Sequence, residues 1–360
     1  MTIAERTEPA SRPAGLSRAE LDALLDSHIE SALATLNGPA ALLSGMARFH
    51  FGMADEHLRP IPPKARVQGK RMRPRIAILC CLAAGGDTEV AAPLGAAIEL
   101  LHNFTLVHDD IQDRSEQRHH RPTVWSRWGE GQAINTGDAV FATAHLALFQ
   151  LGEAGVPDGL ILRLAEAFDQ MTIEIVAGQV LDLGFEGRAD VTADDYLTMI
   201  AGKTAAIVRY AAWAGALLGA ADDAHAERFA AFGHALGIGF QIRDDVLGIW
   251  GSPEATGKAA TDDIRQRKQS LPVVILRERA GDADRHELDA LYSQAAIDQD
   301  GIDRVLTLLA RYDVRTAVEA RIAAYHDDAR FALDAAAGEG ANAAHDALLD
   351  LVESLASRSG

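Results

Sequence analysis

Residues 99–113 read ELLHNFTLVHDDIQD, an apolar helical segment that ends in three aspartates. Asp109 and Asp113 are four residues apart, so they share one face of the predicted helix and their charges repel. The C-terminal end of a helix dipole also disfavours anions. Such a cluster needs a compensating cation, and carboxylates at this spacing suit Mg²⁺, which bridges carboxylates to phosphate oxygens.

A second acidic site lies in residues 239–249, GFQIRDDVLGI, where Asp244 and Asp245 again follow an apolar helical segment. A single aspartate pair of this kind is usually a solvated helix end. Two clusters, each embedded in apolar sequence, instead favour a metal site to which two facing helices contribute.

The rest of the chain predicts an all-α fold. Hydrophobic residues make up 48% of the 360 residues, enough for a sizeable core, and Ala and Leu outweigh β-branched and aromatic residues. Apolar residues recur at helical spacing, as in Leu21, Leu24 and Leu25, and no segment shows a convincing strand alternation. Ser17 and Glu20 predict a capping box at the first helix.

The domain organisation follows from composition and breaks. Residues 1–15 are rich in Pro, Ala and charge and are expected to form a disordered leader. Breaks fall at residues 59–63, 85–87, 121–122, 152–158, 219–223, 251–257 and 281–284. No linker rich in Gly, Ser and Pro divides the chain, so residues 16–360 are expected to form one domain, closed by helices in 317–355.

The charge and the cysteines limit the partners and the compartment. A formal net charge of -18 argues against nucleic acid and anionic membrane as partners. The adjacent Cys80 and Cys81 in an apolar run suit reduced core thiols. The N-terminal segment lacks the apolar core of a signal peptide, and no uninterrupted apolar stretch reaches the ~18 residues of a membrane span. A cytoplasmic protein without stable membrane insertion is expected.

Cationic residues accompany the acidic clusters. Residues 69–74 read GKRMRP, and Arg118 follows the first cluster, while Lys203, Lys258 and Lys268 add three more cations. A basic hexamer alone is usually a solvated turn. Together with the carboxylates, these residues predict a site that neutralises diphosphate charge from two sides.

From about residue 69 to 272 the chain resembles the trans-isoprenyl (polyprenyl) diphosphate synthase family. The matching motifs follow in order: GKRMRP at 69–74, ELLHNFTLVHDDIQD at 99–113, RPTVW at 121–125, QAINTGDAVF at 132–141, GQVLDL at 178–183, GKT at 202–204, GFQIRDDVLG at 239–248 and DIRQRKQSLP at 263–272. The resemblance implies a bundle of antiparallel helices around a central cavity, usually in a homodimer, with the two aspartate-rich helices facing each other.

The resemblance also implies the reaction. Isopentenyl diphosphate is joined to dimethylallyl, geranyl or farnesyl diphosphate, with about three Mg²⁺ ions per active site, for which Mn²⁺ can substitute. The allylic diphosphate ionises, and the double bond of isopentenyl diphosphate attacks the allylic cation. No side-chain nucleophile is needed.

Roles carry over to matching positions. Asp109, Asp113, Asp244 and Asp245 match metal ligands, and Asp110 and Lys203 complete the catalytic set. Lys70, Arg73, His102 and His119 match the isopentenyl diphosphate site; Arg118, Lys203, Thr204, Gln241, Lys258 and Lys268 match allylic diphosphate contacts; Phe104, Thr105, Gln179 and Asp182 line the pocket. His102 stands seven residues before Asp109 and shares its helix face, which favours this role over that of a core histidine.

Three positions depart from the family pattern. His119 replaces an arginine that binds isopentenyl diphosphate, and an imidazole does not replace a guanidinium fork unless Arg121 or protonation of His119 helps. Gly248 replaces the third aspartate of the second motif, which leaves Asp244 to carry most of that metal. Trp125 replaces a common histidine and is expected only to pack.

Phe104 and Thr105, five and four residues before Asp109, resemble the members that make geranylgeranyl diphosphate, because side-chain size there limits product length. Alternatively, Phe104 only packs between helices, and the limit lies deeper, near Ile98 or Leu101.

Three other activities stay open. A class I terpene cyclase-like enzyme would act on one prenyl diphosphate, but GKRMRP and His102 speak for a second substrate. A non-catalytic partner subunit would be expected to lose the first acidic motif, which is intact. A metal phosphohydrolase built on His108 and Asp109 would leave the second acidic site and GKT unexplained.

Overall fold

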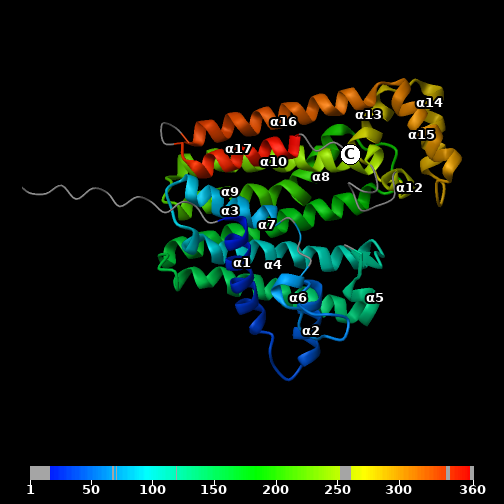
Figure 1. Ribbon diagram of the computed structural model, residues 1–360. Coiled ribbons are helices and arrows are strands. Elements are labelled where there is room, and N and C mark those ends of the chain that lie inside the picture. The colour runs from blue at the N-terminus through cyan, green and yellow to red at the C-terminus, as the bar shows by residue number, and fades with distance from the viewer. Residues whose placement is uncertain are drawn as a thin grey trace, which may run out of the picture.

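Long helices lie side by side through the molecule (Figure 1). They are α4 (Thr88–Gln112), α6 (Glu130–Phe149), α7 (Asp158–Phe185), α9 (Ala206–Leu218), α10 (Asp223–Trp250) and α16 (Val314–Ala337). α4 packs on α6 and on α3 (Met72–Ala83), and α10 packs on α9 and α16. The predicted all-α class is confirmed.

The computed structural model describes residues 17–66, 69, 71–118, 120–251, 261–337 and 341–356. The predicted leader and three predicted site residues, Lys70, His119 and Lys258, lie outside the described residues.

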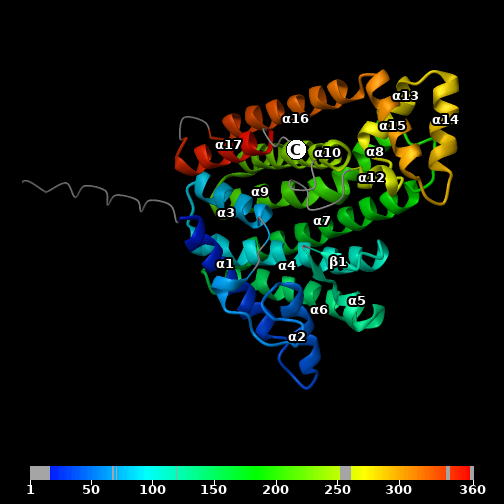
Figure 2. The same ribbon diagram turned by 45° about the vertical axis from the view of Figure 1, so that its right-hand side comes forward.

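Shorter elements complete the bundle. They are α1 (Arg18–Ala34), α2 (Ala41–His50), η1 (Pro63–Ala65), α5 (Val124–Trp128), η2 (Gln150–Gly152), α8 (Ala193–Ile200), the π-helical turn η3 (Ala201–Ala205), α12 (Asp262–Arg265), α13 (Leu271–Arg279), α14 (Asp282–Tyr292), α15 (Gln299–Arg311) and α17 (Ala343–Ala356). Two short strands, β1 (Gln117–Arg118) and β2 (Arg121–Pro122), form an antiparallel hairpin where only a break was predicted. The hairpin, α8 and α12 to α15 lie at one end of the bundle (Figure 2).

Local signals explain several helix boundaries. The predicted capping box is present: the Ser17 hydroxyl accepts from the Glu20 N–H, and the Glu20 carboxylate accepts from the Ser17 N–H at 2.8 Å. The predicted break at 85–87 lies between α3 and α4, the one at 219–223 ends on the first residue of α10, and the one at 281–284 runs into the first turn of α14. The breaks at residues 35–40 and 186–192 were not predicted, although Gly38 and Gly187 stand in them.

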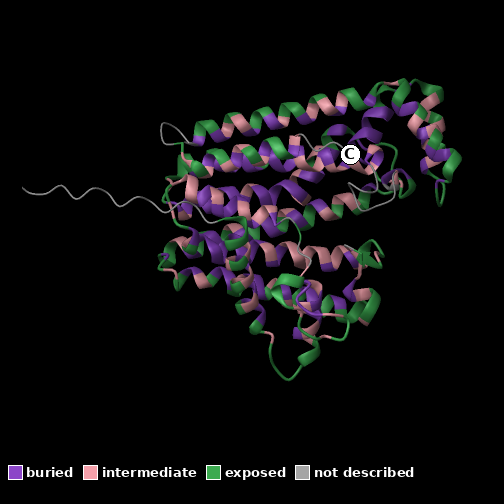
Figure 3. Ribbon diagram, viewed as in Figure 1, coloured by how far each residue is buried: buried purple, intermediate pink, exposed green. Residues whose placement is uncertain are grey.

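Burial follows the amphipathic pattern (Figure 3). α16 buries one face and exposes the other, whereas the interior helices are largely buried. Among the described residues, α4 is long and apolar enough to cross a membrane, but 67% of its most apolar window lies inside the bundle. This burial is typical of a core helix. Cys80 and Cys81 are free thiols in the core, as expected.

Candidate active site

The first acidic cluster lies at the C-terminal end of α4. Asp109 and Asp110 occupy the last turn, and Asp113 ends the helix with its N–H donating to the Asp109 carbonyl at 2.8 Å. Asp113 is exposed and Asp109 is half-buried. Burial raises the pKa of Asp109 to about 6 against the opposing charge of Lys203, and Asp113 adds to the rise. A cation bound at these carboxylates would offset this cost.

Asp110 has a different environment from Asp109. Its carboxylate is 2% exposed and accepts from Nε and Nη2 of Arg118 at 3.0 and 2.8 Å. Arg118 lies on β1, so the hairpin folds back onto the end of α4. Burial raises the pKa of Asp110, and the bond from Arg118 opposes the rise. Asp110 therefore positions Arg118, which leaves Asp109 and Asp113 as the open carboxylates.

The two aspartates of the second cluster also differ. Asp244 is half-buried on α10. Asp245 is 8% exposed, and its carboxylate accepts from the Tyr196 hydroxyl at 2.6 Å, the Leu271 N–H at 3.0 Å and the Gln241 amide at 3.1 Å. Burial raises the pKa of Asp245 to about 7. Protein donors occupy three of its roughly four acceptor positions, so Asp244 is the more accessible ligand, and the metal role of Asp245 stays a prediction. Asp245 also joins α8, α10 and α13.

Electrostatic interactions between residues of separate elements show that the two acidic clusters belong to one site. Lys203 of η3 lowers the pKa of Asp109 on α4, and Asp244 on α10 acts on the buried guanidinium of Arg73. Burial lowers the pKa of Lys268, but the nearby carboxylates outweigh it and raise the pKa overall. Asp263 has the larger effect, and Asp113 of the first cluster follows. The amide of Gln179 on α7 donates to Gln112 Oε1 at 2.7 Å. These interactions come from α3, α4, α7, η3 and α10.

The GKT motif lies on the π-helical turn η3, which joins α8 to α9. Two glycines allow its backbone to touch α7: a Cβ at Gly178 would lie 2.2 Å from the Lys203 nitrogen, and one at Gly202 would lie 2.6 Å from the Glu174 carbonyl oxygen. Single π-helical turns occur frequently at functional sites. This contact places Lys203 and Thr204 beside α7.

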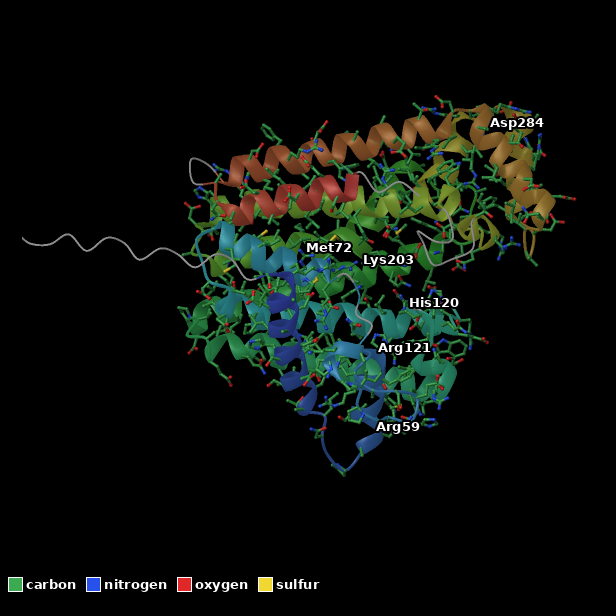
Figure 4. The ribbon with its side chains drawn as sticks, viewed as in Figure 1. Arg59, Met72, His120, Arg121, Lys203 and Asp284 are labelled. Carbon is green, nitrogen blue, oxygen red and sulfur yellow. The ribbon has the colours of Figure 1, made fainter. Side chains whose placement is uncertain are left out.

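The side chains of the turn meet predicted pocket residues. Lys203 forms an ion pair with Asp182, and the Thr204 hydroxyl donates to Gln241 Oε1 at 2.8 Å. In the view of Figure 4, Lys203 lies above the hairpin residues His120 and Arg121. The structure thus brings together the predicted contacts to the allylic diphosphate, Lys203, Thr204 and Gln241.

The predicted isopentenyl diphosphate site pairs Arg73 of α3 with His102 of α4. Arg73 Nη1 and His102 Nε2 are 3.1 Å apart. Burial, with the nearby Arg73 and Arg118, holds the pKa of His102 well below 6.5, so the imidazole is neutral. Since a guanidinium only donates, Nε2 accepts and Nδ1 carries the proton. Arg71 of the same GKRMRP motif instead donates to Asp26 of α1.

Arg121 does not replace the arginine missing at position 119. Its Nη2 donates to the Phe49 and Ala54 carbonyls at 3.0 and 3.1 Å, and its guanidinium lies 4.7 Å from the Phe49 ring centroid. Arg121 therefore ties the hairpin to the end of α2. Trp125 packs against the core cluster that contains Phe49. Its indole N–H donates to the Ser115 carbonyl at 2.8 Å.

Below the first acidic cluster, aromatic rings form a continuous column that we call the aromatic column. Its members are Phe104 of α4, Phe141 and His145 of α6, Phe168 of α7 and Tyr210 of α9, with ring centroids 5.0, 4.8, 5.2 and 5.6 Å apart in that order. Thr105 uses its hydroxyl to donate to the His102 carbonyl. Ile98 and Leu101, the deeper candidates for the limit on product length, are fully buried in the core.

Several contributors to this region escaped the sequence analysis. Phe141 is the last residue of the matched QAINTGDAVF motif, so the sequence could have indicated it. Tyr196 lies outside every matched motif. A cavity of about 350 Å³ lies elsewhere, between α7, α9 and α10, with Arg163, Arg209 and Trp213 in its lining. No predicted site residue lines it.

The carboxylates fit a metal that arrives with its substrate. Within the described ranges, no three His, Cys, Asp or Glu side chains are close enough to hold a metal ion unaided. Mg²⁺ usually takes one or two carboxylates and completes its shell with waters and phosphate oxygens. Asp109, Asp113 and Asp244 can supply those carboxylates.

Comparisons with known proteins give the family of this chain. The polyprenyl synthetase family model matches residues 58–309. The chain is 42% identical to a (2E,6E)-farnesyl diphosphate synthase of Mycobacterium tuberculosis over 70% of this chain and 69% of that one. It is also 42% identical to a geranylgeranyl diphosphate synthase of the same organism over 74% of each chain.

Solved structures give the same result. A polyprenyl synthetase from Streptomyces coelicolor superposes with a TM-score of 0.83 at 33% identity, covering 94% of this chain and 98% of that one. A geranylgeranyl pyrophosphate synthetase from Pyrococcus horikoshii superposes with a TM-score of 0.82 at 29% identity, covering 94% and 96%. The fold, the paired acidic helices and the family match together show that this chain belongs to the polyprenyl synthetase family.

Proposed function

We propose that this chain joins isopentenyl diphosphate to dimethylallyl, geranyl or farnesyl diphosphate and releases pyrophosphate. The observation that carries the proposal is that cationic side chains from three separate elements gather at the end of α4. Lys203 of η3 and Arg118 of β1 act on Asp109, and Arg73 of α3 lies 3.1 Å from the neutral His102. Two separate diphosphate sites distinguish a condensing enzyme from a terpene cyclase.

The residues divide the work of the reaction. Asp109, Asp113 and Asp244 would hold Mg²⁺, which would supply positive charge to the diphosphate leaving group. Lys203 and Arg118 present further positive charge to that group, and Asp110 orients Arg118. Arg73 and the Nδ1–H of His102 hold the second diphosphate, so that its double bond faces the allylic carbon. One carbon–carbon bond forms, and the proton lost from the new unit goes to the departing pyrophosphate.

The metal requirement is the first test. Purified protein is incubated with isopentenyl diphosphate and each allylic primer, with and without Mg²⁺, and products are identified by mass. We expect turnover with Mg²⁺, substitution by Mn²⁺, and about three ions per site as in the family. Asp109→Asn and Asp244→Asn should each lower kcat at least about a hundredfold. The exposed Asp350→Asn on α17 is the control. Absence of any condensed product would favour the cyclase-like enzyme or the non-catalytic subunit.

We further propose geranylgeranyl diphosphate as the main product. The relatives include both farnesyl and geranylgeranyl synthases at equal identity, so the support comes from the site. Phe104 heads the aromatic column below Asp109 and is backed by Phe141 at 5.0 Å. Phe104→Ala should therefore lengthen the product by one or more five-carbon units. Farnesyl diphosphate as the main native product would contradict the assignment.

A homodimer is the proposed assembly. Exposed apolar side chains concentrate on two adjacent helices: Ile134, Leu146 and Phe149 of α6, and Leu162, Ile173, Val176, Val180 and Leu183 of α7. We call this set the apolar face. Within this set, the residues at 173, 176, 180 and 183 recur at helical spacing on one side of α7. A second copy would bury them, as the family resemblance implies. The buried free thiols Cys80 and Cys81 suit the proposed cytoplasmic location.

A further inference from the structure

The carboxylate of Asp263 occupies the space that a side chain at Gly248 would fill. A Cβ built on Gly248 would lie 1.9 Å from Asp263 Oδ2 and 2.6 Å from its Cγ. α12, which carries Asp263, packs against α10 near its C-terminal end (Figure 2). Since Gly248 follows Asp244 by four residues on α10, the two positions share one helix face. Asp263 therefore presents its carboxylate about one turn from Asp244.

Burial and charge make Asp263 part of the same electrostatic site. Its residue is 9% exposed, and Lys268 Nζ lies 3.6 Å from Oδ1, farther than a hydrogen bond. Apart from burial, Asp263 is the leading influence that raises the pKa of Asp245. Asp263 also acts on Lys268, which is influenced by Asp113 of the first cluster as well.

We propose that Asp263 completes the second acidic site by supplying the carboxylate that Gly248 cannot, and that glycine at 248 is needed to leave room for it. This inference rests on the proposed metal-dependent function. Carboxylate oxygens are the ligands that Mg²⁺ prefers, and a metal held by Asp244 gains a second oxygen donor from α12. Metal binding thereby links α10 to the segment that carries Lys268.

The competing role for Asp263 is to anchor Lys268 and nothing more. The two roles predict opposite signs at Lys268. If Asp263 only anchors this lysine, Lys268→Gln should weaken metal binding as much as Asp263→Asn does. If Asp263 binds metal, removal of the neighbouring positive charge leaves metal affinity equal or higher at pyrophosphate concentrations that saturate both proteins, because the cation repels the metal.

The test measures Mn²⁺ binding by the full chain with inorganic pyrophosphate, from the electron paramagnetic resonance signal of free Mn²⁺. Asp263→Asn should lower the affinity for one Mn²⁺ ion by about tenfold or more. Gly248→Ala should do the same without removing any carboxylate, because its methyl group displaces Asp263. The matched controls are Asp350→Asn for charge and Gly184→Ala, whose Cβ would meet nothing within 4 Å.

A swap separates ligand loss from misfolding. Gly248→Asp combined with Asp263→Ala should restore Mn²⁺ affinity to within a few-fold of wild type, whereas Gly248→Asp alone should not. Wild-type affinity in folded Asp263→Asn, with Asp244→Asn impaired, would overturn this inference alone. An unrestored swap in a folded protein, or equal losses in Lys268→Gln and Asp263→Asn, would also overturn it. A wild-type protein that binds no Mn²⁺ with pyrophosphate would overturn the proposed function as well.

Discussion

His102, half-buried on α4, is a proposed contact to isopentenyl diphosphate. Its imidazole is neutral beside Arg73, and Nδ1–H is the proposed donor to a phosphate oxygen. A glutamine also supplies a neutral donor and acceptor, so His102→Gln should change the KM for isopentenyl diphosphate far less than His102→Ala. The alanine variant loses a charge-assisted bond and should raise that KM by roughly tenfold or more. Equal effects of the two variants would contradict the assignment.

The same residue predicts a dependence of stability on pH. Its folded pKa lies well below 6.5, so the unfolded chain takes up a proton that the folded protein does not. This contribution to stability is lost as pH falls below 6.5. Urea unfolding at about pH 5 and about pH 8 should show a smaller acid loss in His102→Gln than in wild type. Part of the loss should persist, because burial also lowers the pKa values of His234 and His326.

The hairpin predicts an effect at position 119. Because Arg121 is committed to the Phe49 and Ala54 carbonyls, it leaves the role of the missing arginine unfilled. His119→Arg should lower the KM for isopentenyl diphosphate by roughly tenfold, more than the KM for the primer. His120→Arg, at the next position in the sequence, is the control. An unchanged KM would show that another group already binds this diphosphate.

Residue types were easier to predict from the sequence than residue partners. The motifs picked out Asp109, Asp244 and Lys203 from their spacing and surroundings. They did not separate Asp245 from Asp244, because the donors that occupy Asp245 come from Tyr196, 49 residues before it, and Leu271, 26 residues after it. The commitment of Arg121 depends on a carbonyl 72 residues upstream.

Among the elements, the π-helical turn η3 carries the most specific prediction. A methyl group at Gly202 would lie 2.6 Å from the Glu174 carbonyl oxygen and would push η3 away from α7. Displacement of catalytic groups by about 1 Å can cost about a hundredfold in rate, so Gly202→Ala should lower kcat on that scale. Gly159→Ala, with open space around it, is the control. An unchanged kcat would mean that this contact does not position Lys203.

Element type was predictable for a physical reason. Long helices repeat their apolar positions many times, so α4, α10 and α16 are visible in the sequence. The strands β1 and β2 span two residues each and are too short to alternate. The turn η3 has no compositional mark, because its extra residue changes hydrogen bonding and not side-chain pattern.

At the scale of the whole molecule, the apolar face predicts the oligomeric state. Ile173 and Val180 are 61% and 64% exposed on α7, and two charges placed there should oppose association. Ile173→Glu with Val180→Glu should halve the mass measured by light scattering during gel filtration. Phe331→Glu is the matched control, since Phe331 is 78% exposed on α16, away from this face. Equal masses for both variants and wild type would contradict the proposed dimer interface.

We also propose that residues 16–360 act as one domain. α10 contributes Phe232 and Leu236 to the largest core cluster, and Ile242 and Val246 to a second one. A helix shared between two clusters joins their unfolding, because neither cluster is complete without it.

The turn η3 also limits how the length of this chain can vary. Tyr196 on α8 is fixed through its bond to Asp245, and α9 is fixed where Gly215 lies against the Ala77 backbone. Deleting one residue between them would rotate one helix relative to the other by about 100°. Either Tyr196 or Lys203 would then leave its place, although no functional side chain had been removed. The loop at 186–192 does not fix the rotation of one helix relative to another, so insertions and deletions should be tolerated there. They should be excluded from residues 201–205.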